Sequence, residues 1–414
     1  MNSYDLIIVG AGASGIFAAI TVKENCFNCS VLVIEKTSKA LGKVKISGGG
    51  RCNVTHDPKK SLLLPEIYPR GSKEMRSPFS QFSFQDTVDW FASHGVKLKT
   101  ESDGRIFPVT DSSQTIIDCF LNLCKNYEIK LQYSEEIISI KQEFNTFTLT
   151  SNQNNIYRSK FLILALGSIN STKTQAILNA IQVVYKPAIP SLFSFNIPSS
   201  PFEGLEGLSF DNVEICISQT KYKNNGPMII THWGISGPAV LKLSAFAAIE
   251  LHELQYEYEV KLNFLPEYSE AEIQKYLADK KQTEAKQLIT NTKIHSLPTR
   301  LVKRIIELSS IESNQKWADL KKSEMYSLVQ HLTQFKIRCS GKTTYKEEFV
   351  TAGGVDLKQV NTKTMECKSI PNLYCIGEMI NVDGITGGFN FQNAWTTGFT
   401  SGVDIATKLN DNIT

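Results

Sequence analysis

The sequence has little excess charge, no long unbroken hydrophobic run and no internal repeat. Its 414 residues carry 44 Lys and Arg against 41 Asp and Glu, a net charge of +3. This balance, without an interleaved basic and aromatic stripe, argues against a nucleic-acid partner. The first apolar stretch, residues 6–20, is broken by three glycines. We therefore expect neither a signal peptide nor a membrane contact, and we expect a cytoplasmic protein.

The cysteine pattern excludes a disulfide framework. Nine cysteines, an odd number, are scattered along the chain, which fits reduced thiols. Cys26 and Cys29 have CxxC spacing, but no second CxxC exists and the pair falls in a predicted turn. We interpret it as structural rather than as a redox or zinc motif. No HExxH or clustered Cys/His spacing is present, so we expect no metal.

The strongest motif stands near the start of the chain. An apolar run over residues 4–9 leads into Gly10, Gly12 and Gly15, which have GxGxxG spacing. In a dinucleotide-binding unit the first glycine permits a tight turn, the second admits a pyrophosphate, and the third lets the helix pack on its strand. The pyrophosphate then lies at the positive end of the helix.

An acidic residue follows at the distance that this motif requires. Glu35 ends a second apolar run, residues 31–34, twenty residues after Gly15. There it accepts hydrogen bonds from the ribose hydroxyls of adenosine and repels a 2′-phosphate. The bound nucleotide is therefore FAD or NAD rather than NADP.

Apolar runs over residues 6–9, 31–34 and 161–166 are typical of parallel strands buried on both faces. They predict an α/β fold with one doubly wound, Rossmann-like sheet. Alternation between 135 and 159 predicts an antiparallel meander, with Ile156-Tyr157 after its last turn. Helices are expected from residue 83 and from residue 111 to Cys124.

The pattern of apolar and polar residues is different from residue 191 to residue 342. Short strands are expected at 192–196, 213–217, 228–231 and 256–264, and helices at 270–279, 301–308 and 317–335. We interpret this stretch as an inserted β-rich and helical domain that carries substrate choice. The run 373–377 then returns to the first sheet. The predicted domains are 1–190 with 343–414, which bind the nucleotide, and 191–342.

The C-terminal part supplies a second half of the nucleotide site. Glu378 follows a strand-ending glycine, Asp383 lies in a turn, and Gly387 and Gly388 open a helix. A flavin needs a partner for its ribityl hydroxyls and N–H groups near its N1–C2=O edge, which gathers negative charge on reduction. An NAD domain needs neither, so FAD is preferred.

Four segments then resemble one family along the whole chain, in order: ISGGGRCNVT at 46–55, THWGISGP at 231–238, TAGGV at 351–355 and GGFNFQ at 387–392. They are similar to the bacterial HI-type YhiN/BaiN flavoproteins, described as aminoacetone oxidases or bile-acid-type enone reductases. The resemblance implies an FAD domain interrupted by a β-barrel-like and helical insertion. Glu378 departs from the Asp often found after that glycine, and Phe389 from an expected Tyr.

These arguments assign a set of residues to the cofactor. The residues expected to bind FAD are Gly10, Ala11, Gly12, Ala13, Ser14, Gly15, Glu35, Lys36, Gly42, Lys43, Ser47, Gly48, Gly49, Gly50, Arg51, Cys52, Asn53, Ala165, Gly167, Gly377, Glu378, Asp383, Gly387, Gly388, Asn390 and Gln392.

Two residues are candidates for catalysis. Arg51 either stabilises the reduced flavin or an acidic substrate, or only stabilises its loop; Cys52 is expected to be a packed thiol. His232 lies in a segment that contains Gly234 and Gly237 and enters a helix at Pro238, and we predict that it transfers a proton, although a structural role is the alternative.

The absence of a second GxGxxG unit leaves no permanent NAD(P)H domain. Electrons come either from NADH or NADPH docked transiently beside the flavin, or directly from the substrate. The first route predicts reduction of a conjugated C=C in a small organic substrate. The second predicts an amine oxidase that uses oxygen, and a third hypothesis is a flavin-bearing RNA- or partner-binding protein.

Overall fold

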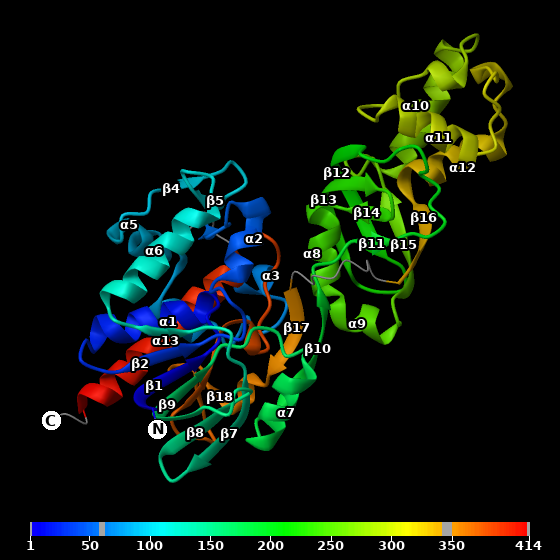
Figure 1. Cartoon of the computed structure of the whole chain (residues 1–414). Coiled ribbons are helices and arrows are strands. Elements are labelled where there is room, and N and C mark those ends of the chain that lie inside the picture. The colour runs from blue at the N-terminus through cyan, green and yellow to red at the C-terminus, as the bar shows by residue number, and fades with distance from the viewer. Residues whose placement is uncertain (1, 58–62, 342–349, 412–414) are drawn as a thin grey trace. The chain divides into compact units, whose positions relative to one another are not determined.

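The computed structural model describes residues 2–57, 63–341 and 350–411, drawn in Figure 1. The chain divides into two compact units. The first comprises Met1–Pro190 and Val350–Thr414, and the second comprises Ser191–Phe349. Each unit has its own hydrophobic core. The predicted boundary at 342/343 lies outside the described residues.

The first unit is built on a nine-stranded sheet. Its main order is β18 (Val360–Asn361), β19 (Glu366–Cys367), β20 (Leu373–Cys375), β9 (Ile156–Leu164), β1 (Asn2–Val9), β2 (Val31–Ile34) and β6 (Lys130–Gln132). The five strands from β20 to β6 are parallel. This confirms the Rossmann-type sheet and the return of the late strand 373–375 to it.

The predicted meander is also present. β7 (Ile137–Glu143) pairs with β8 (Thr146–Ser151), and β8 pairs with the first half of β9, both antiparallel. The sequence separated Ile156-Tyr157 from the run 161–166, but Ile156-Tyr157 and residues 161–164 belong to the single strand β9. That strand alternates in burial over its first half and is fully buried over its second half. One strand therefore serves two pairing environments.

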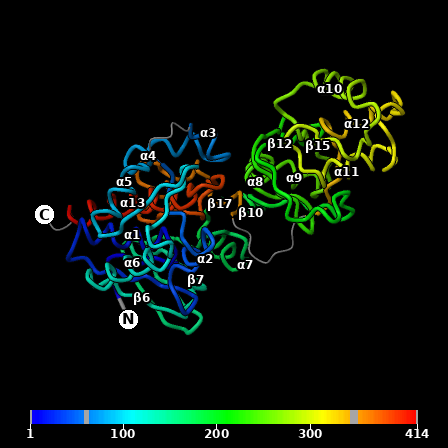
Figure 2. The backbone as a smooth tube through the Cα atoms, turned by 90° about the horizontal axis from the view of Figure 1, so that it is seen from above, coloured from blue at the N-terminus to red at the C-terminus, as the bar shows by residue number. Residues whose placement is uncertain are grey.

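Helices α1 (Ala13–Asn25) and α13 (Phe389–Asp411) lie along each other in both views (Figures 1 and 2). Phe17 of α1 packs against Trp395 of α13, with ring centroids 5.5 Å apart. The predicted helix starts are confirmed. Ser83 and Asp86 form a capping box on α5 (Phe84–Ser93), and Ser112 caps α6 (Ser113–Asn126).

Shorter elements complete the first unit. They are α2 (Gly42–Gly50), α3 (Leu64–Ile67), α4 (Arg76–Gln81), α7 (Thr172–Ala180), η3 (Leu357–Gln359), η4 (Gly377–Met379), the sheet of β3 (Thr55–His56), β5 (Arg105–Pro108) and β4 (Leu98–Thr100), and the pair of β10 (Tyr185–Ser191) and β17 (Val350–Val355).

The second unit contains a six-stranded antiparallel sheet. Its order is β11 (Phe195–Asn196), β14 (Gly234–Ser236), β13 (Lys223–Thr231), β12 (Ser209–Ile217), β15 (Glu257–Asn263) and β16 (Phe335–Ser340). The two edge strands approach each other, because Asn196 Nδ2 donates to the Ser340 carbonyl at 2.7 Å. The sheet is therefore nearly closed, which confirms the barrel-like insertion.

Helices α8 (Pro238–Phe246) and α9 (Ala248–Glu253) separate β14 from β15. A helical group of α10 (Glu270–Thr283), η1 (Ile289–Asn291), α11 (Thr299–Leu308), η2 (Trp317–Asp319) and α12 (Lys322–Thr333) precedes β16. The helix predicted over 317–335 is present as α12, but residues 317–319 form the separate η2 and residue 335 begins β16. In β16, Phe335, Ile337 and Cys339 alternate inward with exposed Lys336 and Arg338.

Candidate functional site

The glycine turn between β1 and α1 has two tight positions and one open position. A Cβ on Gly10 would lie 2.2 Å from the Ala165 carbonyl oxygen, and one on Gly15 would lie 2.1 Å from the Gly10 carbonyl oxygen. A Cβ on Gly12 would meet nothing within 4 Å, and no side chain caps the helix there. The helix N-terminus between Gly12 and Gly15 therefore offers free N–H groups to an anion.

Glu35 is held beside this turn at the end of β2. One carboxylate oxygen accepts from the Ala11 N–H at 2.9 Å, and the other accepts from the Thr37 N–H and hydroxyl, both at 2.9 Å. Oε2, which accepts only from Ala11, keeps a second lone pair for a ribose hydroxyl. Lys36 beside it is exposed. The placement matches the role that the sequence assigns to Glu35.

The glycine-rich run at 47–50 is conformationally special, as predicted. Although α2 spans it, Ser47 has extended backbone angles, and Gly48, Gly49 and Gly50 have φ values of +56°, +69° and +84°. Residues other than glycine rarely adopt such positive φ values. A Cβ on Gly49 or Gly50 would meet nothing within 4 Å, so the run presents open backbone.

Glu378 joins the C-terminal motif to the first one. Its Oε2 accepts from Lys43 Nζ at 2.5 Å, while its Oε1 is buried and has no partner among the described residues. A Cβ on Gly377 would lie 2.4 Å from Ser14 Oγ, so η4 contacts the start of α1 closely. Gly167 also lies beside Glu378, since a Cβ on Gly167 would be 3.7 Å from Glu378 Oε2.

The turn after η4 is fixed by side chains on both sides. Asp383, 1% exposed, pairs with Arg70. Asn390 closes the turn by accepting from the Gly384 N–H and donating to the Gly384 carbonyl, each at 2.8 Å. Arg70 was missed by sequence reasoning, because nothing at residue 70 indicates a partner more than 300 positions away.

The start of α13 packs onto β3. A Cβ on Gly388 would lie 2.7 Å from the Thr55 carbonyl oxygen, and Asn53 Oδ1 accepts from the Gly388 N–H at 2.9 Å in the amide orientation that satisfies both of its ends. His56 Nδ1 contacts the Gly387 carbonyl at 3.1 Å. His56, also missed by the sequence analysis, thus lies at the turn where we predict the flavin ring.

Gln392 occupies a buried network. Its Oε1 accepts from the Thr55 hydroxyl at 2.5 Å and the Thr87 hydroxyl at 2.9 Å, and its Nε2 donates to the Ser83 carbonyl at 3.1 Å. These bonds tie α13 to β3 and α5. The network orients the helix start, and direct contact of Gln392 with FAD stays a prediction.

Arg51 and Cys52 end the glycine-rich run. Arg51 donates to Glu101 at 2.6 Å, lies 3.5 Å from Asp111 and stacks over the Phe107 ring at 4.0 Å. These partners, the Glu101 hydrogen bond first, raise the pKa of Arg51. Burial raises the pKa of Cys52 to about 12. Arg51 thus has the contacts of a loop-stabilising residue, and Cys52 those of a packed thiol.

His232 belongs to the second unit, at the tip between β13 and β14. Its side chain is exposed and has no hydrogen-bond partner among the described residues, and its ring lies 6.1 Å from that of Trp233. A Cβ on Gly234 would lie 2.2 Å from the Phe195 carbonyl oxygen. The predicted helix at Pro238 is α8, so the expected local setting of His232 is present.

The first unit thus brings together the turn at 10–15, Glu35, the run at 42–50, and the segments at 377–390. Two features of these residues fit FAD: an open, uncapped helix N-terminus and the buried, unpartnered Glu378 Oε1. The part of the chain that the structure describes contains no group of His, Cys, Asp or Glu able to hold a metal. None of its helices is long and apolar enough to cross a bilayer.

Residues 4–404 match the family described as HI0933-like protein Rossmann domain. The chain belongs to this family. A solved structure with the same fold is 3-ketosteroid delta1-dehydrogenase from Sterolibacterium denitrificans, with a TM-score of 0.52, 12% identity, and coverage of 99% of this chain and 100% of that one. The first unit therefore has the Rossmann-type fold of FAD-binding proteins.

Three curated relatives align over nearly the full length. "Ribosomal RNA dihydrouridine synthase" of Escherichia coli is 29% identical over 98% of both chains. The Haemophilus influenzae protein of the same name is 27% identical over 98% of this chain and 100% of its own. "3-Dehydro-bile acid delta(4,6)-reductase" of Clostridium scindens is 26% identical over 95% of this chain and 97% of its own.

Proposed function

We propose that this FAD-dependent oxidoreductase reduces a C=C bond conjugated to a carbonyl, and that its substrate is a uracil ring in RNA. The observation that carries the proposal is the full-length similarity to the two ribosomal RNA dihydrouridine synthases. The bile-acid reductase supports the same type of chemistry on a different skeleton.

One type of reaction accounts for the activities that the names of these relatives describe. Dihydrouridine is uridine with two hydrogens added across the ring C5=C6 bond, which is conjugated to the C4 carbonyl. The reduction of a conjugated 3-oxo steroid likewise adds a hydride to the carbon remote from the carbonyl and a proton to the carbon beside it. Bound FAD supplies the hydride, and we propose transiently docked NADH or NADPH as the source of its electrons.

We propose that residues of the first unit bind the FAD. With FAD bound, the Gly10–Gly15 turn would offer N–H groups to the pyrophosphate, Glu35 would accept a hydrogen bond from the adenosine ribose, and Glu378 Oε1 would accept one from a ribityl hydroxyl. The Arg70–Asp383 pair and Asn390 keep the 383–384 turn rigid. Rigidity here fixes the position of the flavin ring.

We propose His232 as the proton donor. Its exposed imidazole has both nitrogens available, and a solvent-exposed imidazole can take up protons from water and pass them to a substrate. The rigid hairpin around Gly234 limits the positions that the ring can take.

The test measures the product as well as the turnover. Purified protein with FAD and NADPH or NADH is incubated with ribosomal RNA lacking dihydrouridine, and nucleosides are analysed by mass spectrometry. We expect dihydrouridine to form. His232→Ala lowers the rate by about 10²–10⁴-fold with unchanged flavin content if His232 supplies the proton, and His232→Gln is the matched variant without an acid.

Three alternative outcomes would overturn parts of the proposal. Product from a 3-oxo-Δ4 steroid but not from RNA would reject the uracil substrate and retain the chemistry. Bleaching of the flavin by an amine, with no reduction by NADH or NADPH, would instead support the oxidase hypothesis. A normal rate for His232→Ala would remove His232 from proton transfer.

A further inference from the structure

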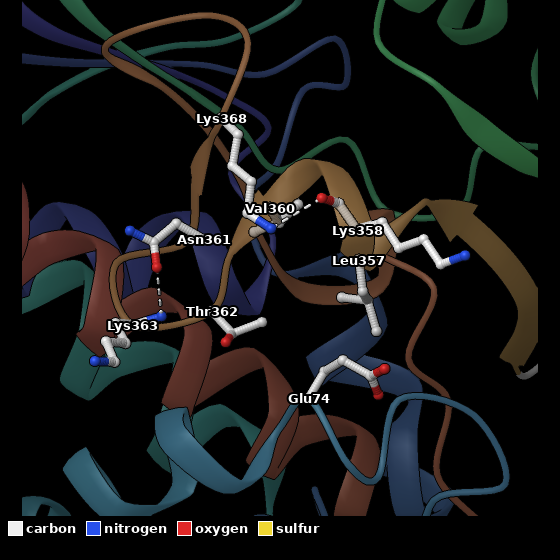
Figure 3. A pocket seen from close by; sticks show the side chains of 8 residues that line it. All are labelled: Glu74, Leu357, Lys358, Val360, Asn361, Thr362, Lys363 and Lys368. Atoms are coloured by element: carbon white, nitrogen blue, oxygen red, sulfur yellow. Dashed lines mark hydrogen bonds between the residues drawn. The ribbon is translucent and has the colours of Figure 1, made fainter.

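A hollow of about 330 Å³ lies in the first unit, lined by η3, β18, the turn after β18 and Glu74. Three of its eight lining residues are lysines: Lys358, Lys363 and Lys368. Glu74 is the one acidic residue that lines it. Figure 3 shows these side chains at close range.

The three lysines are exposed, and none of them pairs with a carboxylate within the described ranges. Lys368 Nζ donates to the Lys358 carbonyl at 3.0 Å. In Figure 3 the Lys358 and Lys363 side chains extend away from each other on opposite sides of the hollow. Their charges are therefore spread around the rim. This arrangement suits an extended polyanion better than a single small anion.

The hollow is connected to the candidate flavin site through one segment. A Cβ on Gly71 would lie 3.2 Å from Leu357 Cδ1, in the lining of the hollow, and 2.5 Å from Val382 Cγ2. Arg70, the preceding residue, pairs with Asp383. A polymer bound at the hollow thus lies beside the segment that fixes the 383–384 turn.

β18 forms one edge of the nine-stranded sheet. Lys73 and Arg76, which flank Glu74 in sequence, are also exposed. The described lining of the hollow therefore carries more cations than anions, although the net charge of the whole chain is only +3. Phosphate contacts of this kind fix the position of a nucleic acid without reading its sequence.

We propose that this lysine-rimmed hollow binds the phosphate backbone of the RNA substrate. The inference rests on the proposed function, because it assigns a positioning surface to an RNA whose uracil is reduced elsewhere. Each phosphate contact to single-stranded RNA contributes about 0.7 to the slope of log affinity against log salt. Removal of three contacts should lower that slope by about 2.

The test measures binding of a short fluorescein-labelled single-stranded RNA by anisotropy, between about 50 and 200 mM salt. The variant Lys358→Glu/Lys363→Glu/Lys368→Glu should bind at least about 10-fold more weakly at about 100 mM salt, with the reduced slope. A triple variant with Lys→Gln at the same positions removes the charge without reversing it, and its RNA affinity should lie between those of the Lys→Glu variant and the wild type.

The control carries the same charge change at Lys97, Lys125 and Lys130, which are exposed and have no ion pair within the described part of the chain. Lys130 lies in β6, at the opposite edge of the sheet. This control triple should bind RNA with the wild-type slope. FAD content and thermal unfolding measured for every variant detect any loss of folding.

The outcomes separate the two proposals. If the wild type binds RNA and both hollow triples bind it equally well, the hollow is rejected as the RNA-binding site and the RNA substrate remains. If the wild type shows no salt-dependent binding of RNA, both are rejected. If the hollow triples lose binding to anionic lipid vesicles while RNA binding is unaffected, a membrane surface replaces RNA as the occupant.

Discussion

Glu378 gives the sharpest test of the cofactor site, because its two carboxylate oxygens have different surroundings. Oε2 faces Lys43, whereas Oε1 is buried and has no partner in the described parts of the chain. A buried acceptor without a hydrogen bond destabilises the protein that contains it, and a ligand hydroxyl that reaches it restores the lost bond. Glu378→Ala should therefore weaken FAD binding without destabilising the protein that lacks FAD.

The magnitude follows from the type of bond. A hydrogen bond to a charged acceptor contributes about 1.5–3 kcal/mol. Its loss corresponds to a dissociation constant for FAD about 10- to 150-fold higher. Glu378→Gln keeps an acceptor oxygen but removes the charge, so its effect should be smaller. Lys43 is 59% exposed, and the salt bridge that Lys43→Met removes should contribute at most about 1 kcal/mol.

The assay titrates deflavinated protein with FAD and follows the quenching of flavin fluorescence, with urea unfolding of the same samples before FAD is added. Unchanged FAD affinity of Glu378→Ala would place Glu378 outside the site. A large loss of stability in the FAD-free Glu378→Ala protein would show that its carboxylate is structural, and the account of the orphaned oxygen would fail.

Three further predictions follow from individual contacts. Gly12→Val should fold normally because its Cβ position is open, yet it should lose FAD because the new side chain occupies the space predicted for the pyrophosphate. Gly15→Val should lower the yield of folded protein, because its Cβ would lie 2.1 Å from the Gly10 carbonyl oxygen. Near-UV circular dichroism and flavin content distinguish the two variants. The hydrogen bond to Glu24 raises the pKa of His94, so this pair stabilises the fold below the unfolded pKa of about 6.5 and the contribution is lost as pH rises through the higher folded pKa. Glu24→Gln should therefore lower the free energy of unfolding in urea by up to about 1 kcal/mol near pH 6 and by almost nothing near pH 9. An equal decrease at both pH values would contradict this assignment.

The sequence predicted the first unit well because its signals are local. The apolar runs 6–9 and 31–34 mark β1 and β2, and the spacing of Gly10 and Gly15 reflects a tight turn in which Gly15 packs against the Gly10 carbonyl. The same kind of signal located the helix starts at residues 83 and 112. Burial on both faces and capping are therefore visible in a short window of residues.

Other features depend on distant partners. The Arg70–Asp383 pair and the Gln392 network join segments more than 300 residues apart, so no window of sequence contains both partners. The predicted helix 317–335 ran one residue into β16, because Phe335 continues the apolar spacing of α12, and the rest of β16 was not predicted. β16 pairs with β15, which is distant in sequence.

Net charge is a further case in which an average hides local structure. The value of +3 argued against a nucleic-acid partner, yet Lys358, Lys363 and Lys368 come from one short stretch of the chain and line the same hollow. Local concentration of charge, rather than its total, determines where a polyanion binds.

The most direct test of the proposed reaction is a single-turnover experiment on the bound flavin. The FAD-loaded protein is reduced anaerobically, freed of excess donor and mixed with uridine-containing RNA. We predict that the oxidised flavin absorption returns as dihydrouridine appears in equal amount. A flavin that stays reduced with RNA and with conjugated enones, and is reoxidised only by oxygen, would contradict the proposal.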